Sequence, residues 1–188
     1  MSDIKFYIVG TAKSKSVKQY YISERWKMWG LLHYTKKIDA YWNNVDDFLN
    51  QATQDFAIKN NFQFVDLIDG VYALDKDIDF SADLIKKEIS KNTASILQSD
   101  VQNLIFNGKK AYHAFLFGCS LLNTGFKTNK PLKKHIRECQ YGKQTLDAYN
   151  FQTAGFLSDK NLYLASNTSS SANAFDEFTW IEILNQIS

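Results

Sequence analysis

The sequence is poor in cysteine and proline and contains no long hydrophobic run. Its 188 residues include two cysteines, Cys119 and Cys139, and one proline, Pro131. Two cysteines are too few for a disulfide scaffold and lack the spacing of zinc ligands, so we expect ordinary reduced thiols. The chain has no apolar stretch of about 18 residues and no basic-then-apolar leader, which predicts a soluble cytoplasmic protein without membrane contact.

Histidine is scarce as well, and the common nucleotide and nucleophile motifs are missing. The three histidines, His33, His113 and His135, follow no zinc or iron spacing, and His113 is expected to be a core or boundary residue. Neither G-x-x-x-x-G-K-[ST] nor G-x-G-x-x-G occurs, which disfavours a nucleoside triphosphate site. The absence of G-x-S-x-G disfavours serine-based acyl transfer. We therefore expect no metal and no organic cofactor.

The composition is that of a single folded domain over residues 1–188. Apolar residues make up 45% and charged residues 22%, which is enough apolar content for a core and argues against disorder. The net charge of +2 does not by itself indicate nucleic acid. Basic side chains nevertheless concentrate in two segments expected to be loops: Lys13, Lys15, Lys18, Arg25 and Lys27, and Lys127, Lys130, Lys133, Lys134, His135 and Arg137. They are either solvated loops or phosphate contacts.

Short apolar runs alternate with amphipathic segments along the chain. Strands are predicted at 4–9, 62–67, 103–108 and 161–166, and helices at 24–34, 45–60, 81–92, 109–117 and 175–187. Ser81 is the expected N-cap of its helix, with Leu84 inward, and Phe178 is expected inward on the last helix. This alternation predicts an α/β fold, a three-layer α/β/α arrangement around a four-stranded parallel sheet. Residues 118–160 give no clear pattern.

The first strand and the segment after it suggest a binding pocket. FYIVGTAKSKSVKQYYISERWKMW begins as an apolar strand and breaks at Gly10 into a small, lysine-rich segment, with several aromatic rings behind it. Ligands of parallel sheets bind where the loops at the carboxyl ends of the strands converge. Three polar stretches, GTAKSKS, DLIDG and SNTSSSANA, are expected at those ends.

Four motifs in order resemble the uracil-DNA glycosylase superfamily. They are VGTAKSKS with QYYISERWKMW, FVDLID at 64–69, IFNGKKAYHAF at 105–115 and ASNTSSSANAF at 165–175. The most similar branches are the mismatch-specific uracil/thymine-DNA glycosylases and the hypoxanthine (deoxyinosine) DNA glycosylases. The resemblance spans nearly the whole chain, apart from 118–160, which would be a divergent insert.

The resemblance implies a monomeric DNA glycosylase that hydrolyses the N-glycosidic bond of a flipped-out base, uracil or hypoxanthine above all, in base-excision repair. Asp66 would be the catalytic carboxylate, ending the second strand and orienting water. The base pocket would comprise Gly10, Thr11, Ala12, Tyr21 and Asn107, with main-chain N–H groups of the Gly10–Ser14 loop holding the departing base. Asn107 would read the base with both donor and acceptor. DNA contacts would come from Lys13, Ser14, Lys15, Ser169, Ser170, Ser171 and Ala172.

Several positions depart from the family pattern and keep other functions open. The asparagine of the first motif that orients water is Ala12 here, the proline after it is Lys13, and the proline of the last motif is Asn167. These changes favour a catalytically silent module that binds nucleic acid or protein. The low net charge also fits a small-molecule nucleoside hydrolase or binder.

The candidate residues also have purely structural interpretations. Asp66 would then cap a loop, Asn107 would belong to an Asn-Gly turn, and Tyr21 would be a core tyrosine.

Overall fold

The computed structural model describes residues 3–14, 27–38, 52–72, 78–122, 129–144, 159–168 and 175–187. These residues form an α/β fold around one five-stranded sheet of order β2-β1-β3-β5-β4. The strands are β1 (Phe6–Ser14), β2 (Phe62–Tyr72), β3 (Asn103–Asn107), β4 (Gly142–Gln144) and β5 (Asn161–Ala165). All neighbouring strands pair in parallel except β4, which runs antiparallel to β5 at the sheet edge.

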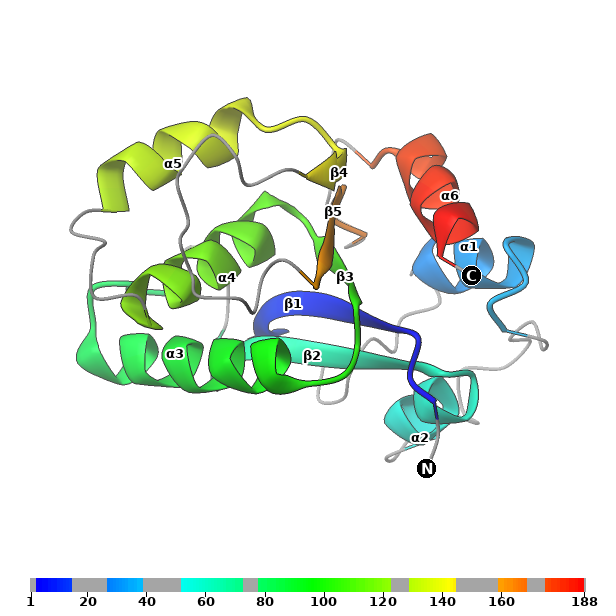
Figure 1. The fold of residues 1–188 in the computed structure, drawn as a ribbon, viewed down its shortest axis with the longest axis horizontal. Coiled ribbons are helices and arrows are strands. Elements are labelled where there is room, and N and C mark those ends of the chain that lie inside the picture. Colours follow the sequence, from blue (N-terminus) through cyan, green and yellow to red (C-terminus); the bar gives the residue numbers. More distant parts are fainter. Residues whose placement is uncertain are drawn as a thin grey trace.

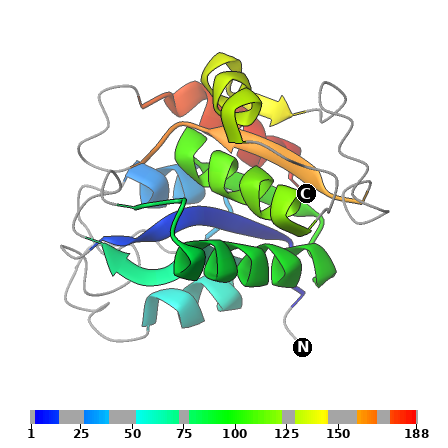
Figure 2. The same ribbon diagram turned by 90° about the vertical axis from the view of Figure 1, so that its left-hand side faces the viewer.

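Helices pack on both faces of the sheet. They are α1 (Lys27–Tyr34), α2 (Ala52–Lys59), α3 (Asp83–Gln98), α4 (Lys109–Leu122), α5 (Asn129–Glu138) and α6 (Glu177–Gln186). Figure 1 shows α3, α4 and α5 on one side of the strands, and α1, α2 and α6 on the other. In Figure 2, α3 and α4 lie side by side in front of β1. The sheet is therefore covered from both sides, as parallel sheets generally are.

The strand residues alternate between two separate cores because successive side chains point to opposite faces. On β3, Leu104 and Phe106 belong to the core under α3 and α4, whereas Ile105 belongs to the core under α1 and α6. On β5, Leu162 and Leu164 join the first core, and Tyr163 joins the second. Both strands therefore occur in the sequence as continuous apolar runs, which is why their positions were predictable.

The prediction of a four-stranded sheet is wrong, because β4 adds a fifth strand within the segment that gave no clear pattern. A three-residue strand is too short to show a period, and it forms by main-chain pairing with β5. The basic segment around Lys134 is also a helix, α5, and not a loop. Pro131 is the third residue of that helix, where a missing N–H costs no hydrogen bond within the helix.

β1 and β2 are longer than predicted, so residues 10–14 and 66–70 of the expected polar loops are strand. β1 continues through Gly10 to Ser14, and β2 continues past Asp66 to Tyr72. Each segment supplies the hydrogen-bonding partner of the other, with a bulge between Ala12 and Lys13. Polar composition suggested loops here, but backbone pairing decided the outcome.

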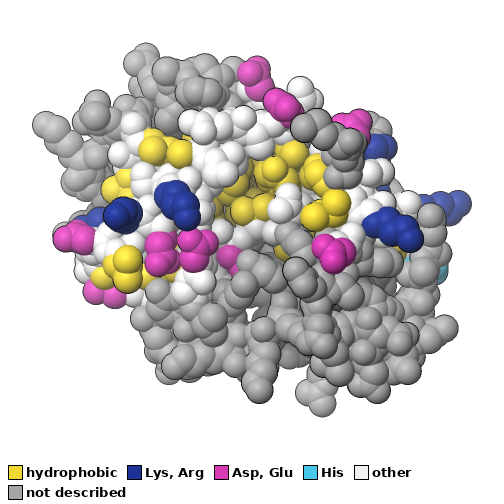
Figure 3. Space-filling model, turned by 90° about the horizontal axis from the view of Figure 1, so that it is seen from below, with side chains coloured by type: hydrophobic (Ala, Val, Ile, Leu, Met, Phe, Trp, Pro, Cys, Tyr) yellow, Lys and Arg dark blue, Asp and Glu magenta, His cyan; other side chains and the backbone are white. Residues whose placement is uncertain are grey.

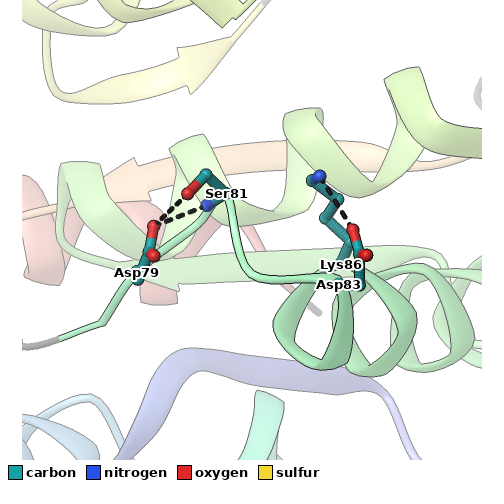
Figure 4. A network of polar contacts seen from close by, with 4 residues as sticks. All are labelled: Asp79, Ser81, Asp83 and Lys86. Atoms are coloured by element: carbon teal, nitrogen blue, oxygen red, sulfur yellow. Dashed lines mark hydrogen bonds and ion pairs between the residues drawn. The ribbon is translucent and has the colours of Figure 1, made fainter.

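Three predictions about helix ends and faces are also wrong. Ala82, without a side-chain cap, precedes α3, while Ser81 donates its hydroxyl and its N–H to Asp79 Oδ1 at 2.6 and 2.8 Å (Figure 4). These hydrogen bonds lower the pKa of Asp79. Leu84, expected inward, is 66% exposed, and Phe178 on α6 is 81% exposed. Both residues lie in the first turn of their helix, where the spacing of apolar residues does not show clearly which positions face the core.

Candidate functional site

One row of residues crosses the sheet where β3 and β5 end. Gly10 on β1 pairs with Asp66 on β2, and Asn107 on β3 pairs with Ala165 on β5. The preceding row pairs Val9 with Phe106, so Asn107 follows at the level of Gly10. The order from β2 to β5 is therefore Asp66, Gly10, Asn107, Ala165.

Asp66 and Asn107 share one face of this row. Strand alternation puts Asp66 on the face of Phe64 and Asn107 on the face of Ile105. Both of these neighbours belong to the core under α1 and α6. The Cα atoms of Asp66 and Asn107 are about 10 Å apart, two strand spacings. Gly10 lies between them and contributes no side chain, so a carboxylate and a carboxamide flank a glycine.

Asp66 is largely buried within the sheet. Its exposed fraction is 9%, and β2 continues from it as far as Tyr72. The expectation that Asp66 ends its strand is therefore wrong, because β1 extends to Ser14 and pairs with the rest of β2. The carboxylate nevertheless lies level with the carboxyl ends of β3 and β5.

Asn107 lies in the Asn-Gly turn that its structural interpretation predicts, and its role in reading a base stays a prediction. It ends β3 before Gly108, which has φ +97° and donates its N–H to Ala165 O at 3.0 Å. The Asn-Gly turn is therefore present. In addition, Asn107 Oδ1 accepts hydrogen bonds from Thr168 N at 2.9 Å and from Thr168 Oγ1 at 3.3 Å. The side chain thus joins the ends of β3 and β5.

The expected loop from Gly10 to Ser14 is extended strand backbone. Gly10, Ala12, Lys13 and Ser14 all stand in register with β2. Thr11 is buried, and Ala12 packs against the core under α3 and α4. The prediction of a loop over these residues is therefore wrong, because pairing with β2 makes the segment extended. The role of its N–H groups in holding a departing base stays a prediction.

Other predicted site residues fall beyond the described part of the chain. Tyr21 and Lys15 lie outside the described residues, as do Ser169, Ser170, Ser171 and Ala172. Lys13 and Ser14 are described for their backbone alone. The row of Asp66, Gly10 and Asn107 is thus the part of the predicted site that the structure brings together.

The sequence did not indicate that Thr168 and its neighbours support the candidate site. Thr168 is fully buried, and Ser166 Oγ accepts a hydrogen bond from Asp176 N at 2.7 Å. Ser166 O accepts a hydrogen bond from Trp180 Nε1 at 2.8 Å. The start of the 166–168 segment is therefore tied to α6. Only the hydroxyl-rich composition of the last motif hinted at this role.

Charges of both signs surround α3. Lys86 contacts Asp83 at 3.2 Å, and Lys91 contacts Asp69 at 3.6 Å. Figure 3 shows acidic and basic side chains intermixed on the described part of the lower face, beside an apolar area. Lys109 Nζ donates to Arg137 O at 2.9 Å. These described cations contact protein groups, so a phosphate contact would have to compete with them.

The thiols and His113 fit structural roles. His113 is buried, with its ring edge-on to Phe80 at 5.4 Å, as predicted. Cys119 and Cys139 are free and buried, and burial raises the pKa of both thiols. Cys139 Sγ lies 3.3 Å from His135 Nε2. A raised pKa keeps the thiol protonated, which argues against a thiolate nucleophile.

Metal-binding side chains do not cluster in the described part of the chain. In the described ranges, no three side chains of His, Cys, Asp or Glu gather as a metal site. No helix within those ranges is both long and apolar enough to cross a bilayer. Comparison with protein-family models and with curated proteins returned no match to this chain.

Proposed function

We propose that this protein is a DNA glycosylase related to the uracil-DNA glycosylase superfamily. It would hydrolyse the N-glycosidic bond of a deaminated or otherwise altered base, with uracil and hypoxanthine as the first candidates. The observation that carries the proposal is the row in which Asp66 and Asn107 flank Gly10 on one face of the sheet. Three motifs widely separated in sequence supply these three residues.

The residue types in the row match the chemistry of glycosidic hydrolysis. The Asp66 carboxylate would orient a water molecule and stabilise positive charge developing on the sugar. As the bond from C1′ to the base nitrogen breaks, the water oxygen bonds to C1′ and its proton passes to solvent or to the departing base. Gly10, without a side chain, would let the base approach the sheet, and Asn107 would contact its edge.

The sheet supports the same proposal. β2, β1, β3 and β5 are adjacent and parallel, and helices lie on both of their faces. This arrangement is compatible with the three-layer fold that the resemblance implies. β4 would then be an addition at the edge, supplied by the segment that matches none of the four motifs.

A catalytically silent module that binds nucleic acid or protein is the second candidate. Ala12 stands where the mismatch-specific branch has its water-orienting asparagine, and an alanine can neither orient nor activate water. Ala12 also packs against the core. Under this proposal Asp66 would have only a structural role in the sheet. Its replacement would change the stability of the protein without changing any reaction.

The test is base release from labelled oligonucleotides. Single-stranded and duplex DNA containing uracil, hypoxanthine, xanthine or a thymine mismatch would be incubated with the protein, followed by alkaline cleavage of abasic sites. The Asp66→Asn variant removes the charge and keeps the shape. Asp69→Asn is the matched control, because Asp69 lies on the same strand and is exposed toward α3, where Asn92 Nδ2 donates to it at 3.0 Å.

Cleavage by the wild type and by Asp69→Asn, with at least a hundredfold loss in Asp66→Asn, would support the glycosylase and the role of Asp66. Equal cleavage by all three proteins would remove Asp66 from the mechanism. Salt-sensitive DNA binding without cleavage of any substrate would favour the silent module.

A further inference from the structure

The orientation of the Asn107 carboxamide is fixed by its partner. The group at 2.9 Å is the main-chain N–H of Thr168, which can only donate a hydrogen bond. The atom facing it must therefore be the carboxamide oxygen, since the NH₂ group in that place would meet another donor. The identities of Asn107 Oδ1 and Nδ2 therefore follow from the hydrogen bond that Thr168 N donates.

Thr168 also occupies the second lone pair of that oxygen. Its hydroxyl lies 3.3 Å from Asn107 Oδ1, so one residue supplies both donors. A carbonyl oxygen has two lone-pair directions, and both are used here. The two hydrogens on Asn107 Nδ2 remain, and Nδ2 makes no hydrogen bond to another described residue. Asn107 can therefore offer a ligand donors but no acceptor.

The surroundings hold this arrangement in place. Thr168 is fully buried, so a flipped carboxamide would leave its N–H without an acceptor away from water. Gly108 N donates to Ala165 O at 3.0 Å, which fixes the backbone directly after Asn107. Ser166, two residues before Thr168, is tied to α6 through Trp180 Nε1 at 2.8 Å. Both sides of the contact are thus anchored by independent hydrogen bonds.

Resting on the proposed glycosylase function, we infer that Asn107 reads a base by donation alone and does not test a ring N–H. The pocket then takes bases that present a carbonyl oxygen to Asn107, whether or not the adjacent ring nitrogen is alkylated. Bases that present an exocyclic amino group are rejected, because two donors would face each other. N-alkylated keto bases are thereby added to the substrate class. This proposal differs from the expectation that Asn107 uses donor and acceptor together.

The first experiment tests the fixed oxygen without any ligand. Hydrogen exchange of the Thr168 amide is measured by ¹⁵N NMR in the wild type, in Asn107→Leu and in Asn103→Leu. Asn103 begins the same strand and donates to Lys5 O at 3.1 Å, so its variant controls for disturbance of β3. We expect Thr168 exchange to accelerate at least tenfold in Asn107→Leu and to stay unchanged in Asn103→Leu. An unprotected Thr168 amide in the wild type would overturn the inference.

The second experiment measures binding of uracil, 3-methyluracil and cytosine through the Asn107 side-chain amide signals. Dissociation constants of uracil and 3-methyluracil within about threefold, with cytosine at least tenfold weaker, would support recognition by donation alone. Uracil binding with 3-methyluracil tenfold weaker would overturn it and leave the glycosylase proposal standing. No binding of either keto base, with no base release from DNA and a protected Thr168 amide, would overturn the glycosylase proposal and this inference with it.

Discussion

The hydroxyl of Thr93 on α3 occupies the space that a side chain at Gly118 on α4 would need. A Cβ built at Gly118 would lie 2.0 Å from Thr93 Oγ1 and 2.8 Å from Thr93 Cβ. Both residues lie inside the core where α3 packs against α4. The close approach of these helices therefore depends on glycine at this position.

Gly118→Ala is expected to destabilise the protein by about 2 kcal/mol, because α3 and α4 must move apart. This destabilisation is a net value. It already includes the gain of about 1 kcal/mol in helix propensity that alanine has over glycine. The change in unfolding free energy would be measured by urea denaturation. In the double variant Gly118→Ala/Thr93→Ala, the atom at 2.0 Å is removed but Cβ at 2.8 Å stays. Part of the lost stability should therefore be restored.

Gly30→Ala is the matched control for that experiment. Gly30 also lies within a helix, α1, and a Cβ there would meet no atom of the described residues within 4 Å. We expect stabilisation of about 0.5–1 kcal/mol from helix propensity alone. Equal effects at both glycines would contradict the packing argument.

Gly108→Ala should destabilise the turn that carries the candidate site. Gly108 has φ +97°, and its Cβ would lie 3.2 Å from Asn167 Cβ. An L-residue is strained in this conformation, so we expect a loss of about 1–2 kcal/mol in unfolding free energy. The Thr168 amide should also exchange faster with solvent, because the turn positions Asn107. An unchanged stability would show that the turn tolerates a side chain.

We expect the contribution of Asp176 to the stability of α6 to be lost at acid pH. Its Oδ1 accepts from Thr179 N at 3.1 Å and its Oδ2 from Thr179 Oγ1 at 2.5 Å. The side-chain hydrogen bond with Thr179, followed by its backbone N–H, holds the pKa of Asp176 below the ordinary value. The ionised cap therefore contributes stability above the unfolded-state pKa near 4, and this contribution is lost as pH falls through the lower folded pKa.

Two substitutions at Asp176 separate capping from titration. Asp176→Ala should cost about 1 kcal/mol at pH 7 through loss of the cap. Asp176→Asn keeps an accepting oxygen but cannot titrate, so its disadvantage relative to the wild type should shrink as pH falls below about 4. Urea denaturation at pH 7 and at pH 3 would measure both effects. A constant difference between Asp176→Asn and wild type would refute the titration.

The two thiols should react slowly in the folded protein. Burial raises the pKa of Cys119 and Cys139, which lowers the fraction of reactive thiolate at neutral pH. With a disulfide reagent at pH 7.5, we expect both thiols to be modified at least a hundredfold faster in denaturant than under native conditions. Rapid native reaction at Cys139 would indicate that His135, 3.3 Å away, activates it.

The sequence by itself determined the elements that are apolar or periodic over many residues. The strands at 103–107 and 161–165 were predicted almost to their ends, because burial on both faces makes them continuous apolar runs. The helix at 83–98 was predicted in part, as 81–92, and Ile85 and Ile89 on it are buried. The consecutive residues Asn107 and Gly108 indicated a turn, because glycine adopts the positive φ seen at Gly108 more easily than other residues do.

Only the tertiary structure decided where polar segments lie and what their side chains contact. Residues 10–14 and 68–70 were expected in polar loops, yet both segments lie in strands, because β1 and β2 pair with each other as far as Ser14 and Tyr72. Asn107 Oδ1 meets Thr168 across 61 residues of sequence, and no local pattern encodes that contact. Hydrogen bonding between distant segments depends on the register of the sheet, and the register is fixed only when both cores pack.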